Sequence, residues 1–282
     1  MILDPRPAPQ AISKAYRSYY THQPPDAENA VLEGGGATKL IAKAYIARRY
    51  GFGKGGSLFL YALAVLMWPL RQQLDYYLRH LPGRHGRLLD IGCGNGGFMQ
   101  RARWVGWSVV GVEPDVNAAK VASEATGAEI HASINAITDG RFDVITMSHV
   151  IEHLHQPVDM LKQCHQLLRP GGRIWIATPN IAGVGRRLYG EAWQALEVPR
   201  HLVMPSARAL IAMLTSAGFD EVQFMRRGRG AEKRLRASDS RAGILGRQRW
   251  PIVPMATVVD IVSSIWPFAS EELVVVATRS ER

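Results

Sequence analysis

Short apolar runs and longer amphipathic stretches alternate along the chain from residue 87 onward. Runs that are apolar and end in turn residues predict buried strands over 87–92, 108–115, 128–133, 142–149 and 173–180. Apolar residues spaced three or four positions apart predict helices between them, over 97–107, 116–127 and 157–172. Strands that alternate with helices in this way build a parallel sheet with helices on both faces, so this part of the chain is expected to have an α/β fold.

The end of the chain departs from this alternation. A predicted helix over 206–219 is followed by a strand over 220–230 and a last strand over 271–279. Between these two strands lies an insertion at about 227–270, which is first basic and then apolar. The order predicts a last strand that pairs antiparallel with the sixth.

The first 85 residues have a different pattern. Residues 1–35 are rich in Pro, Ala and Gly, which predicts a flexible segment, and 36–85 carry helical spacing. A run of apolar residues and one Pro covers 58–70, which is shorter than the ~20 residues that cross a bilayer. We expect a buried helix there, with an interfacial or lid helix as the alternative. The predicted organisation is a flexible 1–35, a helical cap at 36–85 and a main domain at 86–282.

Charge and cysteine content narrow the setting. The chain has a net charge of +10 and only two cysteines, and its first residues contain no apolar signal region. Cysteines this few predict a cytoplasmic protein without a disulfide framework. The positive charge favours acidic partners such as anionic lipid surfaces, phosphorylated substrates or nucleic acid. The basic run at 226–236 has no interleaved aromatic residues, so nucleic-acid binding is not expected.

The stretch "LLDIGCGNGG" fits two cofactor patterns, G-x-G-x-x-G and D-x-G-x-G-x-G. A dinucleotide would place its pyrophosphate at this loop, where the carboxylate of Asp90 would repel it. S-adenosylmethionine carries an ammonium and a sulfonium instead, and both suit an acid. Glu113 ends the next predicted strand and can accept the two ribose hydroxyls of either cofactor. Asp90 therefore favours the methyl donor.

The stretches "LLDIGCGNGGFM", "VVGVEPD", "FDVITMSHVIEHLHQPVDML" and "LLRPGGRIWIATPN" together resemble class I S-adenosylmethionine-dependent methyltransferases. The branch that they resemble is that of the ubiquinone-biosynthesis O-methyltransferases, over about 86–226 and the final strand. The resemblance implies a Rossmann-like seven-stranded, mostly parallel sheet with an antiparallel last strand. It also implies S-adenosyl-L-methionine as the cofactor and S-adenosyl-L-homocysteine as the product.

The same resemblance implies roles for individual residues. Those expected to bind the cofactor are Asp90, Gly92, Cys93, Gly94, Gly96, Glu113, Pro114, Ser133, Ile134, Ser148 and His149. Many relatives carry an acid where this chain has Ser133 and Asn135. Cys93 is expected to fill space in the loop rather than to act as a nucleophile.

Three histidines are candidates for a general base on the acceptor, namely His149, His153 and His201. His149, Glu152 and His153 also spell H-x-x-E-H, a zinc-peptidase pattern. The pattern starts where a strand ends, and no cluster of carboxylates accompanies it, so no metal is predicted. The alternative for Glu152 and His153 is a polar pair that fixes the loop.

The predicted function is methyl transfer to an oxygen of a small or lipid-linked acceptor, such as a quinone precursor or a sugar. The alternatives are an NAD-dependent oxidoreductase, a basic RNA-modifying protein and a scaffold without activity. The two apolar segments, 58–70 and 250–268, have Trp and Pro at their ends and basic residues before them. That pattern is typical of helices that lie on an anionic membrane, whereas the competing interpretation is a core or dimer contact.

Overall fold

The computed structural model describes residues 1–5, 7, 23, 36–51, 56–246 and 250–280. Most of the segment 1–35 lies outside the described residues, so its flexibility stays a prediction. The chain divides into two compact units. Unit 1 comprises Met1–Arg17, Ser148–His165 and Ile176–Thr278. Unit 2 comprises Ser18–Met147, Gln166–Trp175 and Arg279–Arg282.

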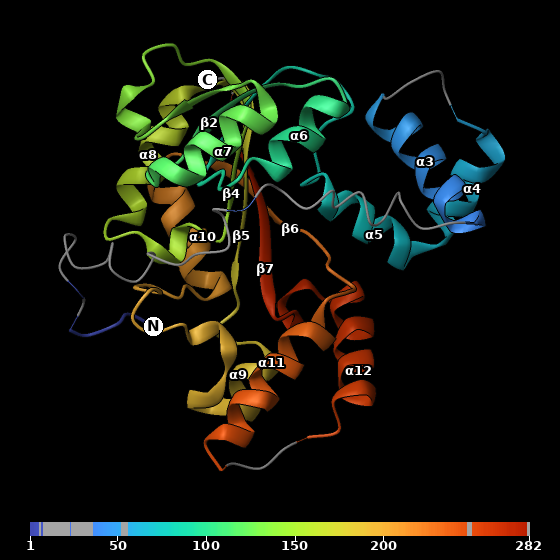
Figure 1. Ribbon diagram of the computed structural model, residues 1–282, viewed down its shortest axis with the longest axis vertical. Helices are drawn as coiled ribbons and strands as arrows, with labels where there is room; N and C mark the ends of the chain where they lie inside the picture. The colour runs from blue at the N-terminus through green and yellow to red at the C-terminus, as the bar shows by residue number, and fades with distance from the viewer. Residues whose placement is uncertain (6, 8–22, 24–35, 52–55, 247–249, 281–282) are drawn as a thin grey trace. The chain divides into compact units, whose positions relative to one another are not determined.

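Seven strands form one sheet in the order β3-β2-β1-β4-β5-β7-β6 (Figure 1). Their bounds are Arg87–Ile91 (β1), Ser108–Val112 (β2), Glu129–His131 (β3), Phe142–Ser148 (β4), Leu168–Pro179 (β5), Asp220–Phe224 (β6) and Glu272–Thr278 (β7). β1 pairs in parallel with β2 and β4, and β2 pairs in parallel with β3. β6 and β7 pair antiparallel, which confirms the predicted fold class and the predicted last strand.

The helices lie between the strands and in the two segments that the strand pattern does not cover. Their bounds are Ala37–Tyr50 (α3), Leu58–Leu66 (α4), Trp68–Tyr77 (α5), Gly97–Trp104 (α6), Val116–Thr126 (α7), Pro157–Leu167 (α8), Val184–Tyr189 (α9), Ala207–Ser216 (α10), Ala231–Ile244 (α11) and Ile252–Ile265 (α12). Short 3-10 helices cover Ile134–Ala136 (η3), Ile151–His153 (η4), Gly190–Ala192 (η5), Gln194–Leu196 (η6) and Pro267–Ala269 (η7).

Local signals set several helix ends. The Asp115 carboxylate accepts a hydrogen bond from the Ala118 amide at 2.9 Å and so caps α7. The same helix ends at Gly127, which has a left-handed φ of 61° that favours glycine. Ser206 caps α10 in the same manner, with its hydroxyl accepting from the Ala209 amide at 3.2 Å.

The boundary between α8 and β5 differs from the prediction. The predicted helix runs to Gly172, but α8 ends at Leu167 and β5 begins at Leu168. The reason is pairing with residues far along the chain. The Gly171 amide donates to the Arg279 carbonyl at 2.9 Å, and the Arg279 amide donates to the Gly172 carbonyl at 2.8 Å. The Pro-Gly-Gly sequence is therefore part of β5, with Gly171 at a left-handed φ of 72°, rather than a turn that closes a helix.

The core of unit 2 combines α3 and α5 with the buried face of β1. Ile46, Leu74, Leu78 and Leu88 are fully buried in one apolar cluster. Met147 and Trp175, which lie in the predicted buried strands 142–149 and 173–180, are also buried in this unit. A second cluster in unit 1 joins α9 to α11 and α12.

The expectation of a buried helix over 58–70 is wrong. The segment forms two helices that meet at Met67, and Ala64 is the one buried residue of α4. Phe59 and Leu66 are 75% and 76% exposed. A continuous apolar run cannot distinguish a helix that is buried all round from one that packs on one side only.

Two tyrosines of α3 hold the start of unit 2 together through one carboxylate. The hydroxyls of Tyr45 and Tyr50 donate to the same oxygen of Asp75 on α5, at 2.7 and 2.6 Å. Burial, reinforced by this carboxylate, raises the pKa of both tyrosines, so both remain protonated donors.

We expect Tyr50→Phe to lower the free energy of unfolding by about 1.5–3 kcal/mol, the typical contribution of a hydrogen bond to a charged group. Urea denaturation monitored by circular dichroism measures this change. Tyr61→Phe is the matched control, because Tyr61 stacks on Tyr45 with ring centres 5.8 Å apart and removal of its hydroxyl leaves Asp75 unaffected. Equal losses in the two variants would contradict the role of Asp75.

Candidate functional site

The glycine loop follows β1 and leads into α6. Gly92, Gly94 and Gly96 have φ values of 66°, 54° and 82°, a region that residues with a Cβ rarely adopt. A Cβ on Gly96 would also lie 3.1 Å from the Ala122 Cα of α7 and 3.0 Å from the Thr126 Cγ2. The loop thus runs close against α7 and presents backbone amides at the start of α6, as in sites that approach a ligand through main-chain atoms.

Asp90 lies fully buried beneath this loop. One of its oxygens, Oδ1, accepts a hydrogen bond from the Thr146 hydroxyl at 2.8 Å and pairs with the Arg79 guanidinium. The other oxygen, Oδ2, is buried without a hydrogen-bond partner among the described residues. A buried carboxylate oxygen in this condition calls for a donor or a cation. The ammonium group of S-adenosylmethionine, directly or through water, fits this requirement.

Arg79 is a functional residue that sequence reasoning missed. It follows α5 with a left-handed φ of 46°, and its guanidinium lies 3.8 Å from the ring centre of Phe98. It also donates to the Thr146 hydroxyl at 2.9 Å, so Arg79 and Thr146 together hold Asp90. No local motif marks Arg79. The only signal is the general need of a buried acid for a cation.

Glu113 closes the loop from the end of β2. Its Oε2 accepts from the Gly94 amide at 2.9 Å, and its Oε1 accepts from the Asp115 amide at 3.0 Å. Burial raises the pKa of the Glu113 carboxyl above its usual range. Each carboxylate oxygen has a second lone pair, so both can still accept from ribose hydroxyls.

The remaining predicted cofactor residues of unit 2 surround the same strand ends. Pro114 follows Glu113, and Ile134 is buried at the start of η3, where the Ser133 hydroxyl accepts from the Asn135 amide at 3.3 Å. Cys93 is buried, and burial together with the charge of Asp90 raises the pKa of its thiol. A thiol held protonated is a poor nucleophile, which agrees with a space-filling role.

Ser148 and His149 belong to unit 1. His149 has a left-handed φ of 54°, and its amide donates to the Ala177 carbonyl at 2.8 Å. Its ring is held between two buried carboxylates, with Nδ1 3.2 Å from Glu152 and Nε2 2.6 Å from Glu272. His149 thus combines a strained backbone conformation with a side chain that two carboxylates hold in place. Strained residues that their surroundings hold in this way are typical of functional sites.

The charges around His149 determine its protonation. Burial alone would lower the pKa of His149, but the hydrogen bonds and charges of Glu152 and Glu272 outweigh it and raise the pKa to about 9. Although burial opposes it, ion pairs with Arg234 and Arg227, each 2.8 Å away, keep the pKa of Glu272 well below its usual range. His149 is therefore an imidazolium at neutral pH.

Glu152, His153 and His201 form a second group in unit 1, which we call the Glu152 group. One ligand atom of each residue lies within 4.8 Å of the others, and the two histidine ring centres are 4.7 Å apart. The Nδ1 atoms face backbone carbonyls, that of Arg200 at 3.0 Å for His153 and that of Ala195 at 2.6 Å for His201. This arrangement assigns the ring proton to Nδ1 and a lone pair to Nε2 in both residues.

The Glu152 group could hold a divalent cation. Two imidazoles and one carboxylate are a common ligand set, and Nδ1–H bonds to backbone carbonyls orient such ligands. Zinc ligation by His149 and His153, the arrangement suggested by the H-x-x-E-H spacing, is not what the structure brings together, because Glu272 and Glu152 hold His149. Sequence reasoning missed this set because His201 lies far from His153 along the chain. The predicted absence of a metal stays a prediction.

Comparison with known proteins gives matches that are named as methyltransferases. A family model described as "Methyltransferase domain" matches residues 69–223. Ubiquinone biosynthesis O-methyltransferase of Nitrosococcus oceani is 32% identical over 121 residues, 40% of this chain and 50% of that protein. The protein of the same name from Xanthomonas axonopodis pv. citri is 29% identical over 146 residues, 49% of this chain and 59% of that protein. The chain thus matches about half of the length of these relatives.

Solved structures share the fold. A SAM-dependent methyltransferase of Thermotoga maritima superposes with a TM-score of 0.50 at 18% identity, covering 84% of this chain and 99% of that chain. A phosphoethanolamine N-methyltransferase of Haemonchus contortus, solved with S-adenosylhomocysteine, superposes with a TM-score of 0.50 at 17% identity, over 86% of this chain and 57% of that chain.

The ion pairs of His149 with Glu152 and Glu272 predict a pH-dependent contribution to the free energy of unfolding. Because the pKa of His149 in the folded protein is about 9 and its ordinary value is 6.5, the stabilisation is fully present below about pH 6.5 and is lost as the pH rises through about 9. We expect wild type to be more stable than His149→Asn at pH 6.5, and this difference to narrow by pH 9.5. Asn is the replacement because it tolerates a left-handed φ. Urea unfolding of both proteins at the two pH values measures the difference. If the difference in free energy of unfolding between the two proteins is the same at both pH values, the proposed ion pairs of His149 are contradicted.

Proposed function

The chain belongs to the methyltransferase-domain family. We propose that it methylates an oxygen atom of a small or lipid-linked acceptor. We propose further that this acceptor is a phenolic quinone precursor. The methyl donor of this proposal is S-adenosylmethionine. The family match favours it over NAD as the ligand of the glycine loop.

The residues that would hold the cofactor are those of the glycine loop, with Asp90 beneath it and Glu113 beside it. The unpartnered oxygen of Asp90 is the observation that fits the cationic part of the ligand. S-adenosylmethionine supplies an activated methyl group on a sulfonium. Since the leaving group is already good, the protein contributes mainly alignment of the acceptor and exclusion of water.

The Glu152 group is the observation that carries the proposal of an oxygen acceptor. A hydroxyl must lose its proton as its oxygen is methylated, and a neutral imidazole can accept that proton. The Nδ1 of each ring faces a backbone carbonyl, so Nε2 is the nitrogen that would accept the proton. The Nε2 of His201 lies 3.9 Å from an oxygen of Glu197, and burial lowers the pKa of His201. Glu152 and Glu272 hold a proton on His149, which favours His153 and His201 over His149 as the base.

A quinone precursor as the acceptor is supported by the names of the relatives at 28–33% identity. A phenol loses its proton more readily than an aliphatic alcohol, so a phenolic hydroxyl suits an imidazole that acts as a general base.

The role of Glu113 gives a test of cofactor binding. Loss of hydrogen bonds from a charged acceptor typically costs about 1.5–3 kcal/mol, so Glu113→Ala should raise the Kd for S-adenosylhomocysteine roughly tenfold to a hundredfold in calorimetric titration. Glu124→Ala, on the surface of α7, is the matched control and should leave the Kd unchanged. Saturating cofactor should raise the Tm of wild type by roughly 5–10 °C, and NAD should not. Stabilisation by NAD alone would contradict the cofactor assignment.

The role of His201 gives a test of catalysis. A positioned base typically contributes about 10²–10⁴-fold, so His201→Asn should lower kcat by about a hundredfold or more while cofactor affinity is kept. Transfer of radiolabelled methyl from S-adenosylmethionine to 3,4-dihydroxybenzoate, a soluble catechol, measures it. Because the pKa of His201 is lowered, the rate of wild type should reach its plateau below neutral pH. His165→Asn on α8, where the ring packs against Phe219, is the control in the same unit.

Chelation separates the two roles open to the Glu152 group. If His201 acts as a base, EDTA leaves the rate unchanged. If the group holds a cation that activates the hydroxyl, EDTA abolishes turnover and Mg²⁺ or Zn²⁺ restores it. Cofactor binding without transfer to any catechol would contradict the proposed acceptor class while leaving the cofactor assignment intact.

A further inference from the structure

The insertion between β6 and β7 forms a helix pair, α11 and α12, that pack against each other in unit 1 (Figure 1). Within this pair, α12 is apolar on both its buried and its exposed sides. It packs Ala256 and Val259, with Ile252 and Met255 partly buried, against the apolar cluster of unit 1. It also exposes five apolar residues, namely Val253, Val258, Ile261, Val262 and Ile265. A helix on a protein surface normally carries polar residues on the side that faces water.

The exposed residues form one continuous stripe. Val258 and Ile265 are 60% and 69% exposed, and Ile261 lies between them at helical spacing. Trp266 follows directly and is 61% exposed, with Phe268 two residues further on. Ile244 and Leu245, at the end of α11, are also exposed. We call the stripe of α12 together with Trp266 the α12 face.

Two polar side chains of α12, Thr257 and Asp260, form hydrogen bonds within the protein. The hydroxyl of Thr257, the one polar side chain in the stripe, donates to the Val253 carbonyl at 2.9 Å. Asp260 is the one charged residue of the helix and accepts from the Ala231 amide of α11 at 3.1 Å. A hydroxyl bonded to its own helix can leave water at low cost. The stripe can therefore enter an apolar medium without breaking a hydrogen bond.

Basic residues flank the α12 face. The sequence from 226 to 266 contains nine Lys and Arg residues and three Asp and Glu residues. Arg226, Arg229, Lys233 and Arg241 are exposed. An apolar stripe with Trp at its edge and basic residues beside it is the pattern of helices that lie in the interface of an anionic membrane.

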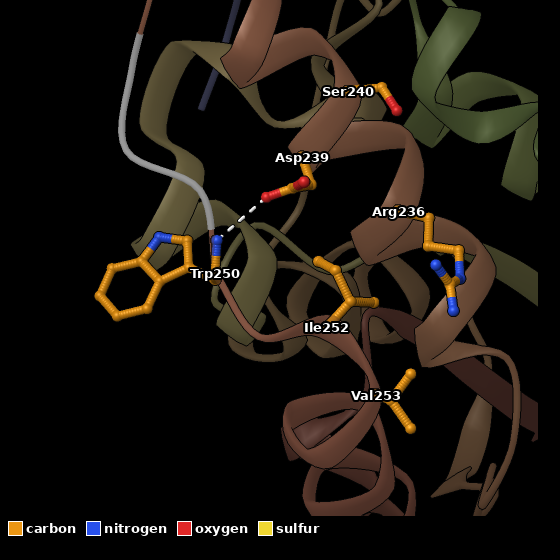
Figure 2. Close-up of a pocket in the computed structure, with 6 residues that line it drawn as sticks. All are labelled: Arg236, Asp239, Ser240, Trp250, Ile252 and Val253. Atoms are coloured by element: carbon orange, nitrogen blue, oxygen red, sulfur yellow. Dashed lines mark hydrogen bonds between the residues drawn. The ribbon is translucent and has the colours of Figure 1, made fainter.

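The cavity beside α12 does not account for this face. It has a volume of about 460 Å³ and is lined by Arg236, Asp239, Ser240, Trp250, Ile252 and Val253 (Figure 2). Arg236 is already paired with Glu232 at 2.6 Å, and Asp239 accepts from the Trp250 amide at 3.0 Å, as the dashed line in Figure 2 shows. Its charged groups thus have partners within the protein, and Val253 is the one exposed apolar residue of α12 that lines it.

We propose that the α12 face docks on the surface of an anionic lipid bilayer. No helix among the described residues is long and apolar enough to span a membrane, so docking is in the interfacial plane. A second copy of the chain is the other conceivable occupant. A symmetric contact through this face would bring two basic flanks together, and like charges oppose such a contact. The proposal does not depend on the identity of the methyl acceptor.

Flotation of the purified full chain with vesicles tests the proposal. Vesicles of phosphatidylglycerol and phosphatidylcholine in equal parts should bind the protein, vesicles of phosphatidylcholine alone should bind it weakly, and added salt should weaken binding. The double variant Ile261→Asp with Ile265→Asp should bind the anionic vesicles with an affinity about tenfold lower, or lower still. Ile211→Asp on α10 is the matched control, since Ile211 is exposed in the same unit but lies outside the face. A Tm shift with S-adenosylhomocysteine shows that each variant is folded.

Three outcomes would overturn the proposal. The first is absence of binding to either kind of vesicle. The second is binding that the double variant retains but that Phe59→Asp on the exposed face of α4 abolishes, which would place the contact in unit 2. The third is a dimer in sedimentation velocity that the double variant dissociates, which would show that a second copy covers the α12 face.

Discussion

Glu152 is a fully buried carboxylate, and a buried charge is tolerated only when partners surround it. Its side chain pairs with His149 at 3.2 Å and accepts from the Thr178 hydroxyl at 3.0 Å. Its backbone carbonyl accepts from the amides of Leu202 and Val203, at 2.7 and 3.1 Å. One residue thus fixes the charge of His149 and, through the chain at 202–203, holds His201 beside His153. The geometry of the site in unit 1 follows from these contacts.

Asp90 plays the corresponding part in unit 2, with one difference. Arg79 and Thr146 satisfy one of its oxygens, while the other is left without a protein partner among the described residues. Glu152 instead has hydrogen bonds on both oxygens. Each oxygen of Glu152 thus has a protein partner, whereas Oδ2 of Asp90 has none among the described residues. Of these two acids, Asp90 is therefore the one that calls for a cationic ligand.

The sequence was sufficient to predict the parts of the fold that local pattern controls. The strand and helix alternation from 87 to 180, the end of α7 at Gly127 and the antiparallel last strand are present in the structure. Boundaries that depend on remote pairing were not predictable, as at 168–172, where Arg279 extends β5. The burial of α4 was also misjudged, because an apolar run reports composition and not which side has a partner.

The site residues also divide into those that a local motif predicts and those that no motif marks. The glycine loop and Glu113 were predictable, because a strand, a tight turn and an acid at fixed spacing form a local motif. Arg79 was not predictable, because no motif marks a cation 11 residues before Asp90. Glu272 was not predictable either, because His149, on which it acts, is remote in sequence. Glu272 is the first residue of the last strand, β7, and nothing in the local sequence distinguishes it. Its function is evident only when Arg227, Arg234 and His149 are seen to surround it.

The sheet and the insertion carry different kinds of information. A fold of this type supplies a cofactor loop whatever the acceptor is, so specificity must come from segments added to the fold. In this chain the insertion pairs a basic helix with a helix whose apolar side faces outward. Exposing such a face to water opposes folding unless something covers it. Packing in the unit 1 cluster explains the buried residues of the insertion, such as Leu235 and Val259, but not the apolar residues that α12 exposes.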